Sequence, residues 1–391
     1  GGSAELERAG LAVADESGHL RLTHPVYSEL IADALPSTER PQLLRRYLRQ
    51  LDRRGATTHA EQLRLAVLRL DAGMAVEPSI LVRGARLARE NNDYVVARRL
   101  GLAALENGAG DDIADVVGAA CYELGDYDRA ARVLSAALGR STDELHRVQL
   151  ALVLRDVHVW GDNDIDRALQ MLRDTASSLT VPVLVDVVRA AEVTTLAFAR
   201  QHRAALDLVE RIDRTAGPVE AIAAVGHVVA LSLSGRTAEA VRRAQQAVAD
   251  GSSGSPDEKV LHLSTHFIGR SFAFVNEGRL TDAVETAARA HLMATRARIP
   301  LNVAWASVNA AHAELLRGRL EAARRWALEA AVLAEAQSLL VCQRLAITIE
   351  LCVAGQLGDA ATAGPLFEHL LASPPDMAFL AELTAVGKAW A

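Results

Sequence analysis

Aromatic residues and cysteine are scarce in this chain. Aromatics make up 4% of the 391 residues, and Ala, Leu and Arg outnumber the β-branched residues, so a fold built on sheets is a poor prediction. Of the three cysteines, Cys121, Cys342 and Cys352, the last two lie ten residues apart on one predicted helix, a rise of about 15 Å that no disulfide spans. Sparse, odd-numbered thiols fit a reducing cytoplasm, which is the expected location.

Long apolar runs and excess positive charge are also missing. We find no apolar run near the roughly 18 residues that cross a bilayer, and no secretory signal, so no membrane partner is expected. The net charge of −7 argues against a segment that holds nucleic acid by neutralising phosphates. Because half of the residues are apolar and 23% are charged, the composition excludes a disordered chain.

A Gly or Asn followed five residues later by Ala recurs along the chain. The clearest copies start at Gly125, Gly278 and Gly318, and weaker ones start at Gly55, Asn92, Asn163, Arg200, Gly235 and Gly358. The mean spacing of these anchors is about 38 residues. Each anchor is expected to end one helix in a left-handed turn, and the small Ala lets the next helix approach closely.

Helix-turn-helix units of this length predict an all-α, tetratricopeptide-like, right-handed α-solenoid. The alternative is an irregular helical bundle in which the spacing arises by chance. The longest interval contains residues 250–257 (DGSSGSPD), which predict an exposed loop.

The first 36 residues depart from the repeat. Residues 4–10 resemble the end of a helix, and residues 11–13 and 19–22 resemble two short strands joined by a turn at 15–18. A further helix is expected from Pro25 to Leu35. This order suggests the tail of a winged-helix module at residues 1–36, followed by a helical-repeat domain at 37–391.

Residues 20–70 resemble a known protein family. The segments LRLTHP (20–25), LP (35–36) and LLRRYL (43–48), with Arg40, are similar to the junction between winged helix and helical repeats in STAND-type ATPases. The segment THAEQL (58–63) is similar to the first repeat of the same proteins. They are the large ATP-binding LuxR-family transcription regulators, among them the MalT-like activators.

The resemblance implies the sensor part of such a regulator. These regulators carry an N-terminal ATPase, an arm, a superhelical sensor and a C-terminal LuxR helix-turn-helix. We find neither a Gly-x-x-x-x-Gly-Lys-Ser/Thr phosphate loop nor a LuxR helix-turn-helix here. ATP is thus expected on an absent upstream module, no cofactor on this segment, and the other domains as partners. In this family an inducer, a sugar in some members, releases an autoinhibited state.

The sequence offers little support for catalysis or metal binding. Gly-x-Ser-x-Gly, His-Glu-x-x-His and Cys-x-x-Cys are all missing, so an enzyme is not expected. His262 and His266 have i, i+4 spacing that can bind metal, but no third ligand lies nearby in sequence. The acids around Asp111 and Asp162 are better explained as helix caps than as a calcium loop.

The stronger signal is a polar slot eight residues before each anchor. It holds Arg155, Glu192, His227, Arg270 and Glu350 inside otherwise apolar helices, with Asn309 beside the slot in one repeat. Charges rarely enter a buried face unpaired, and the first helices of such a solenoid line its concave groove. One turn away on the same face lie His158, Thr195, His262, His266, Asn302 and Trp305.

We therefore predict a small-molecule inducer in the concave groove, with a sugar as the leading class, because polar groups around an aromatic ring suit such ligands. Two simpler explanations stay open for these side chains: solvation of a wet groove, and salt bridges such as Arg155–Glu192 or Arg270–Glu350. The alternative function is a scaffold that binds a peptide or a partner helix.

Overall fold

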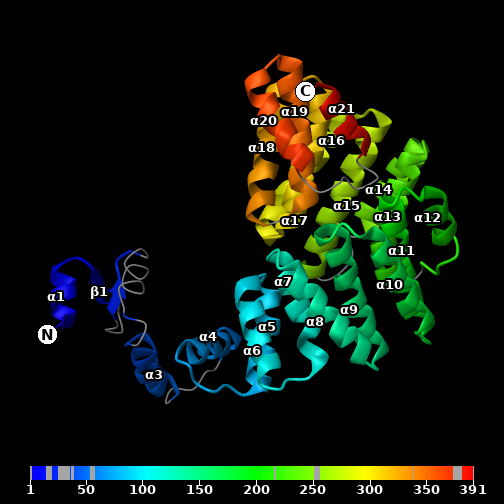
Figure 1. Ribbon diagram of the computed structural model, residues 1–391. Coiled ribbons are helices and arrows are strands. Elements are labelled where there is room, and N and C mark those ends of the chain that lie inside the picture. Colours follow the sequence, from blue (N-terminus) through cyan, green and yellow to red (C-terminus); the bar gives the residue numbers. More distant parts are fainter. Residues whose placement is uncertain are drawn as a thin grey trace.

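The computed structural model describes residues 2–14, 20–24, 36, 39–52, 58–214, 217–250, 256–337, 339–372 and 381–390. An N-terminal arm projects from a curved stack of helices, which turns so that its C-terminal part lies over its N-terminal part (Figure 1).

The arm begins with a helix and a β-hairpin. Its elements are α1 (Gly2–Arg8), β1 (Ala12–Ala14), β2 (Leu20–Leu22), α3 (Glu39–Asp52) and α4 (His59–Asp71). The strands pair antiparallel with Val13 opposite Arg21, which confirms the two predicted strands. The Thr23 hydroxyl donates to the carbonyl oxygen of Gly10 at 2.8 Å and ties the hairpin to the end of α1. The helix predicted from Pro25 to Leu35 lies outside the described residues.

The stack consists of helices in antiparallel pairs. They are α5 (Pro78–Glu90) with α6 (Tyr94–Glu106), α7 (Ala114–Glu123) with α8 (Tyr127–Arg140), α9 (Glu144–Asp156) with α10 (Ile165–Ser177), α11 (Pro182–Phe198) with α12 (His202–Val209), α13 (Gly217–Leu233) with α14 (Thr237–Asp250), α15 (Pro256–Glu277) with α16 (Leu280–Ala297), α17 (Pro300–Leu316) with α18 (Leu320–Ala336), and α19 (Leu340–Leu357) with α20 (Ala360–Ala372). A short 3-10 turn, η1 (Asp111–Ile113), precedes α7; a π-helical turn, η2 (Val157–Gly161), extends α9; and α21 (Ala381–Trp390) packs on α19.

The turns inside these eight hairpins confirm the predicted anchors. All eight anchors from Asn92 to Gly358 have φ between 52° and 82°. In most of them the next N–H donates to the carbonyl four residues before the anchor, as Arg279 does to Phe274 at 2.9 Å. This is the bond that closes a helix end of the Schellman type. The ninth anchor, Gly55, lies outside the described residues.

The alanines five residues after the anchors also lie where the repeat requires them. From Ala97 to Ala363 the eight described ones are buried, at most 5% exposed. Glycines allow further close packing: a Cβ at Gly84 would meet Leu100, and one at Gly118, 34 residues on, would meet Leu134. An equivalent contact repeated at this interval is typical of tetratricopeptide-like hairpins, so the fold is an all-α solenoid of that kind.

Two details differ from the sequence predictions. Of the loop expected at residues 250–257, Asp250 ends α14, and Pro256 and Asp257 belong to α15, since Pro is favoured at a first helical position. Leu340–Leu357 is long and apolar enough to pass a test for a membrane span, contrary to our statement on apolar runs. Because 61% of that segment is buried inside the fold, we interpret α19 as a core helix of the solenoid.

Candidate functional site

Several of the predicted groove residues have protein partners of their own. Glu192, only 9% exposed, accepts from Arg173 Nε of the neighbouring α10 at 2.7 Å. The Asn302 amide donates to the hydroxyls of Ser264 and Thr265 at 2.8 and 3.0 Å, which joins α17 to α15. The Thr195 hydroxyl donates to a carbonyl of its own helix. Glu192 and Asn302 thus link neighbouring helices, whereas the Thr195 bond stays within α11.

Burial shifts the pKa values of three further slot residues. His227 is half-buried, and burial lowers its pKa to about 4, helped by Arg214 and Arg236. The Arg270 guanidinium lies over the Phe274 ring, 5.1 Å from its centroid, and burial lowers the pKa of Arg270. Burial raises the pKa of Glu350. Neither of the two salt bridges suggested above occurs between these described side chains: Arg155 pairs with Asp156 at 3.1 Å instead.

Two more of the twelve predicted residues are a histidine and an asparagine. His266 and Asn309 are buried on α15 and α17. His262 belongs to α15, but its side chain lies outside the described part of the chain. Among the described residues no group of three His, Cys, Asp or Glu is placed to hold a metal ion.

The structure brings Trp305 of α17 together with Trp160, which follows the Arg155–His158 segment. The Trp160 ring meets Trp305 at 5.4 Å between centroids and Phe198 at 5.1 Å, in both cases edge to face. Nearby, the Asn92 amide donates to the carbonyl oxygen of Ala297 at 3.0 Å. Figure 1 shows α17 directly above α7 at this level. We call these contacts of Asn92 and Trp160 with Ala297 and Trp305 the closure contact.

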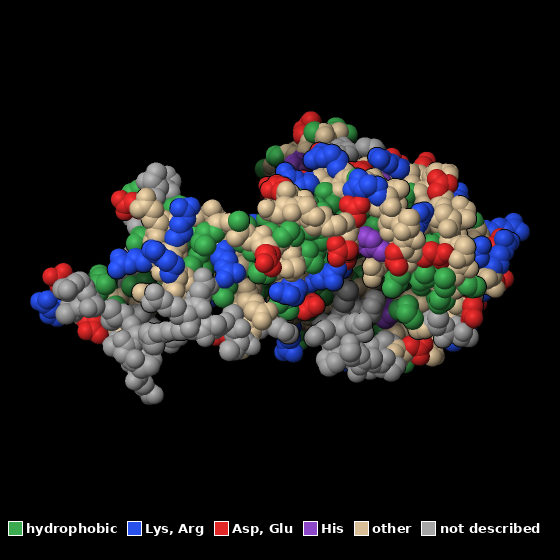
Figure 2. All heavy atoms as spheres, turned by 90° about the horizontal axis from the view of Figure 1, so that it is seen from below, with side chains coloured by type: hydrophobic (Ala, Val, Ile, Leu, Met, Phe, Trp, Pro, Cys, Tyr) green, Lys and Arg blue, Asp and Glu red, His purple; other side chains and the backbone are tan. Residues whose placement is uncertain are grey.

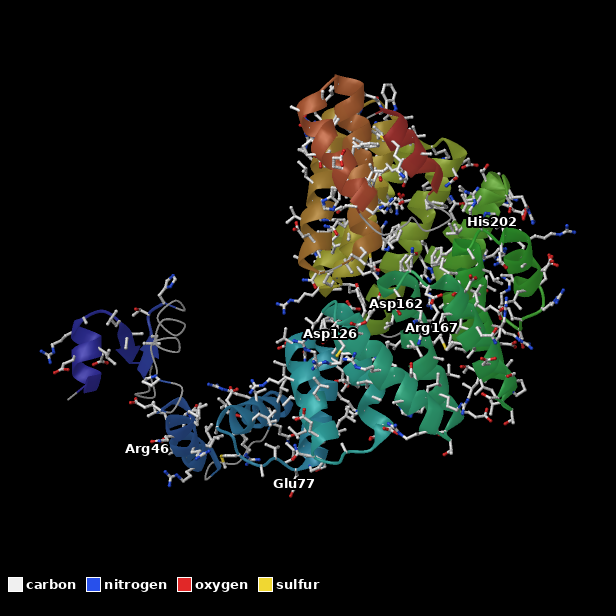
Figure 3. The ribbon with its side chains drawn as sticks, viewed as in Figure 1. Arg46, Glu77, Asp126, Asp162, Arg167 and His202 are labelled. Carbon is white, nitrogen blue, oxygen red and sulfur yellow. The ribbon has the colours of Figure 1, made fainter. Side chains whose placement is uncertain are left out.

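A π-helical turn presents Trp160 to the closure contact. At η2 the N–H of Asp164 donates to the carbonyl of His158, one residue further back than in the other hairpins. Two features accompany the extra residue. His158 Nδ1 lies 2.8 Å from Asp162 Oδ2 across the turn. At Gly161 the backbone packs so closely on the Tyr127 ring that a Cβ would collide with it. Figure 3 shows Asp162 and Asp126 at the level where the two parts of the stack meet. Single π turns inside α-helices are frequent at functional sites.

Beside the π turn lies a group of acidic side chains that is partly enclosed by protein. Asp156 keeps 33% of its side-chain surface exposed, yet burial raises its pKa, against the opposing effects of Arg155 and of a hydrogen bond from Trp160.

A second carboxylate and a tyrosine face Asp156. Burial and the charge of Asp156 together raise the pKa of Glu123, at the end of α7, to about 7, although the charge of Arg89 opposes both. The Tyr122 hydroxyl, in a side chain only 7% exposed, has no hydrogen-bond partner. It is close enough to Glu123 and Asp156 for their charges to raise its pKa. We call Tyr122, Glu123, Arg155, Asp156 and Trp160 the inner recess.

The inner recess offers binding chemistry. Two carboxylates that repel each other gain from a cation or shared proton, the Tyr122 hydroxyl can donate or accept, and the unpartnered Arg155 Nε can donate. Of these five residues the sequence predicted only Arg155 as groove-lining. Asp156 had a visible signal, a charge beside Arg155 in an apolar helix, whereas Glu123 precedes a turn and resembles an ordinary exposed helix end.

A second hollow lies on the arm, away from the closure contact. It measures about 400 Å³ and is lined by Gln42, Arg45 and Arg49 of α3 and by Met74. Arg45 Nε donates to the carbonyl oxygen of Ala72 at 2.9 Å, which fixes α3 against the end of α4. Basic side chains are seen along the arm in Figure 2.

No protein-family model matches the sequence, and no curated protein matches it. Among solved structures, the chain is similar to a Rap protein complexed with competence and sporulation factor, with a TM-score of 0.47 and 12% identity over 70% of this chain and 77% of that one. It is also similar to aspartyl phosphate phosphatase F from Bacillus subtilis, with a TM-score of 0.44 and 12% identity over 72% and 79% of the two chains.

A third similar structure is a STAND protein with a tetratricopeptide repeat sensor from Pyrococcus horikoshii. The TM-score is 0.40 at 13% identity, and the match covers all of this chain and 60% of that one. Likenesses this distant carry no functional inference. The assignment of the fold rests on the eight hairpins and their turns.

Proposed function

We propose that this chain is the effector-sensing segment of a STAND/LuxR-type transcription regulator, and that a small molecule binds inside the solenoid. The main support is the closure contact, because it joins helices some 200 residues apart in the chain directly beside the inner recess. The junction motifs of residues 20–70 support the regulator class.

The proposed mechanism is a population shift. The closed solenoid is one state, and a state with the Trp160–Trp305 contact broken is the other. An effector that binds one state better shifts the balance by its difference in affinity, and the ends of the solenoid pass the change to the neighbouring domains. This segment needs no cofactor for that role; the ATP of the regulator belongs to the upstream module. A sugar is one effector class to test.

The test combines a ligand screen with a distance measurement. A thermal-shift screen of sugars and other metabolites identifies a binder, since a ligand at 100 times its Kd adds about 2.7 kcal/mol to the stability. Spin labels at V95C on α6 and R296C on α16 then report the separation of the two parts; both positions are exposed and the three native cysteines are buried. A binder that leaves this distance unchanged contradicts the proposal.

A partner-binding scaffold is the second candidate function, favoured by the arm. Leu43 and Tyr47, one turn apart on α3, are 50% and 40% exposed. Residues 39–90 contain eleven arginines and six acidic residues, in a chain whose net charge is negative. A partner with an acidic, apolar surface fits this arm. A response to a peptide library that is lost in L43S/Y47S, without any response to metabolites, favours the scaffold.

A further inference from the structure

The hollow between α3 and the segment after α4 has room for a small molecule. Its volume of about 400 Å³ lies in the range of about 300–1,000 Å³ that is typical of ligand sites. Gln42, Arg45 and Arg49 line it with i, i+3 and i+7 spacing, which puts them on one face of α3, and Met74 lines it from the segment after α4. We call the space between these four residues the arm hollow. Its walls are two guanidinium groups, an amide and a thioether.

The Arg45 side chain is held at the arm hollow by the protein backbone. Its Nε donates to the carbonyl oxygen of Ala72 at 2.9 Å, and its Nη2 lies 3.6 Å from the position that a Cβ on Gly73 would take. The bond at Nε leaves the N–H groups of both terminal nitrogens for another acceptor. Because this guanidinium is already fixed, an anion that binds its terminal nitrogens loses less free energy to the ordering of a side chain.

The positive charge of the arm hollow is not balanced by an acid among the described residues. Neither Arg45 nor Arg49 forms an ion pair with a described carboxylate. Asp71, three residues before Met74, is paired with Arg99 of α6 instead. Since arginine keeps its charge at physiological pH, two positive charges line a space that can hold a ligand. The expected occupant is therefore an anion.

We propose that the arm hollow binds a phosphate monoester of a small organic molecule. The phosphate accepts hydrogen bonds from the terminal nitrogens of Arg45 and from Arg49, and the organic part lies against Met74 and the Gln42 amide. A monoester carries a charge close to −2 above a pKa of about 6, which balances both arginines, whereas a single carboxylate carries −1. The arm hollow is separate from the effector site inside the solenoid, so this inference goes beyond the proposed function.

The experiment compares an organic phosphate with two related ligands on the full 391-residue chain. Phenyl phosphate is titrated beside phenyl sulfate and inorganic phosphate by calorimetry at pH 7.5 and low ionic strength. The sulfate ester keeps the ring but has one negative charge, and inorganic phosphate keeps the oxygens without the ring. We expect phenyl phosphate to bind at least fivefold more tightly than either, because it alone matches both the charge of the two arginines and the apolar wall at Met74.

Three variants test the parts of the arm hollow. R49Q removes one guanidinium and is expected to weaken phenyl phosphate binding at least fivefold. R49K keeps the charge without the planar fork and is expected to fall between R49Q and the wild type. M74S removes the apolar wall, so it is expected to lower the affinity for phenyl phosphate to that for inorganic phosphate and to leave the latter unchanged. An M74S variant that binds phenyl phosphate as the wild type does contradicts the placement of the organic part.

R46Q is the matched control for R49Q. Arg46, labelled on α3 in Figure 3, is exposed and does not line the arm hollow, yet its loss changes the charge of the arm by the same amount. R46Q is expected to bind phenyl phosphate as the wild type does, and circular dichroism checks the helicity of each variant. Equal losses in R46Q and R49Q mean that the general charge of the arm attracts the ligand, and they overturn the inference.

The remaining outcomes concern the class of ligand. Phenyl phosphate that does not bind, or phenyl sulfate that binds equally well, overturns the inference. A phosphoserine peptide flanked by alanines carries the same phosphate on a protein chain and is expected to bind no more tightly than phenyl phosphate. Tighter binding of the peptide overturns the assignment to a small molecule. None of these results bears on the sensor function, which the distance measurement tests separately.

Discussion

The turns of this solenoid and its closure contact are built in opposite ways. Each turn in the described chain repeats one solution: a left-handed residue and a buried alanine occur eight times, and the Schellman-type bond occurs in seven of these eight turns. The closure contact is made once, by the Trp160 ring against Trp305 and by one hydrogen bond from the Asn92 side-chain amide to Ala297. Local rules thus set the hairpins, whereas single residues far apart in the chain hold the curvature. Four variants sharpen this difference.

The largest effect is expected where two first helices touch. A Cβ at Gly226 on α13 would lie 2.4 Å from Thr194 Cα, so Gly226→Ala forces α13 away from α11. We expect a loss of about 3 kcal/mol or more in the free energy of unfolding, measured by denaturant titration. Gly269→Ala on α15 is the control, because a Cβ there meets nothing within 4 Å. Equal losses in the two variants contradict the close-packing explanation.

The closure contact is tested by Trp160→Ala. The variant loses both edge-to-face contacts, so we expect its free energy of unfolding to fall by about 3 kcal/mol. Because the hairpins keep their turns, helicity is expected to stay while the radius of gyration from small-angle scattering increases. Trp390→Ala, at a side chain that is 48% exposed on α21, is expected to cost less and to leave the radius unchanged. An unchanged radius in Trp160→Ala means that the contact does not hold the curvature.

The inner recess predicts a dependence of stability on pH. The folded state raises the pKa of Glu123 from 4.5 to about 7, so a proton is held more tightly in the folded chain. The penalty for ionising Glu123 is absent below pH 4.5 and grows as the pH rises to about 7. We expect Glu123→Gln to be roughly 2 kcal/mol more stable than the wild type at pH 8 and equal to it near pH 4.5. Denaturant midpoints of both proteins at pH 4.5, 6 and 8 test this; parallel curves are the contrary result.

The smallest effect is expected at a single turn. Gly278 has φ +82° and open space around it, so the only effect of Gly278→Ala is backbone strain. We expect this strain to lower the free energy of unfolding by about 1 kcal/mol. Gly139→Ala on α8 also meets nothing and has no left-handed backbone, so it is expected to be neutral or slightly stabilising. Thermal melts of the two variants give the comparison. A neutral Gly278→Ala indicates that the turn tolerates other conformations.

The hairpins were predictable from the sequence because their rules are local. Asn163 and Arg200 are unusual turn residues, but the alanine five positions later identified both, and both have positive φ. The unpaired-charge rule also worked for Glu192, although its partner is Arg173 and not Arg155. A pattern of one residue type every 38 positions shows which face a side chain occupies, but not which side chain lies opposite.

The closure contact and the inner recess were not predictable in this way. The pairing of Trp160 with Trp305 depends on small rotations summed over several hairpins, and on the one-residue offset at the π turn that no motif announces. Glu123 becomes unusual only because Asp156 of the next hairpin faces it. Ligand contacts of the twelve predicted groove residues remain a prediction.

The tie between Asn92 and Ala297 has a consequence for cooperativity. Repeat arrays usually unfold in segments, because each unit touches only its neighbours. Here the hydrogen bond from Asn92 to Ala297 joins residues 205 positions apart, and the Trp160–Trp305 ring contact joins residues 145 positions apart. The helices between α5 and α17 therefore cannot unfold one by one without exposing indole surface to water. We expect them to melt as one block, and a protein trimmed before α17 to expose Trp160 and lose that single transition.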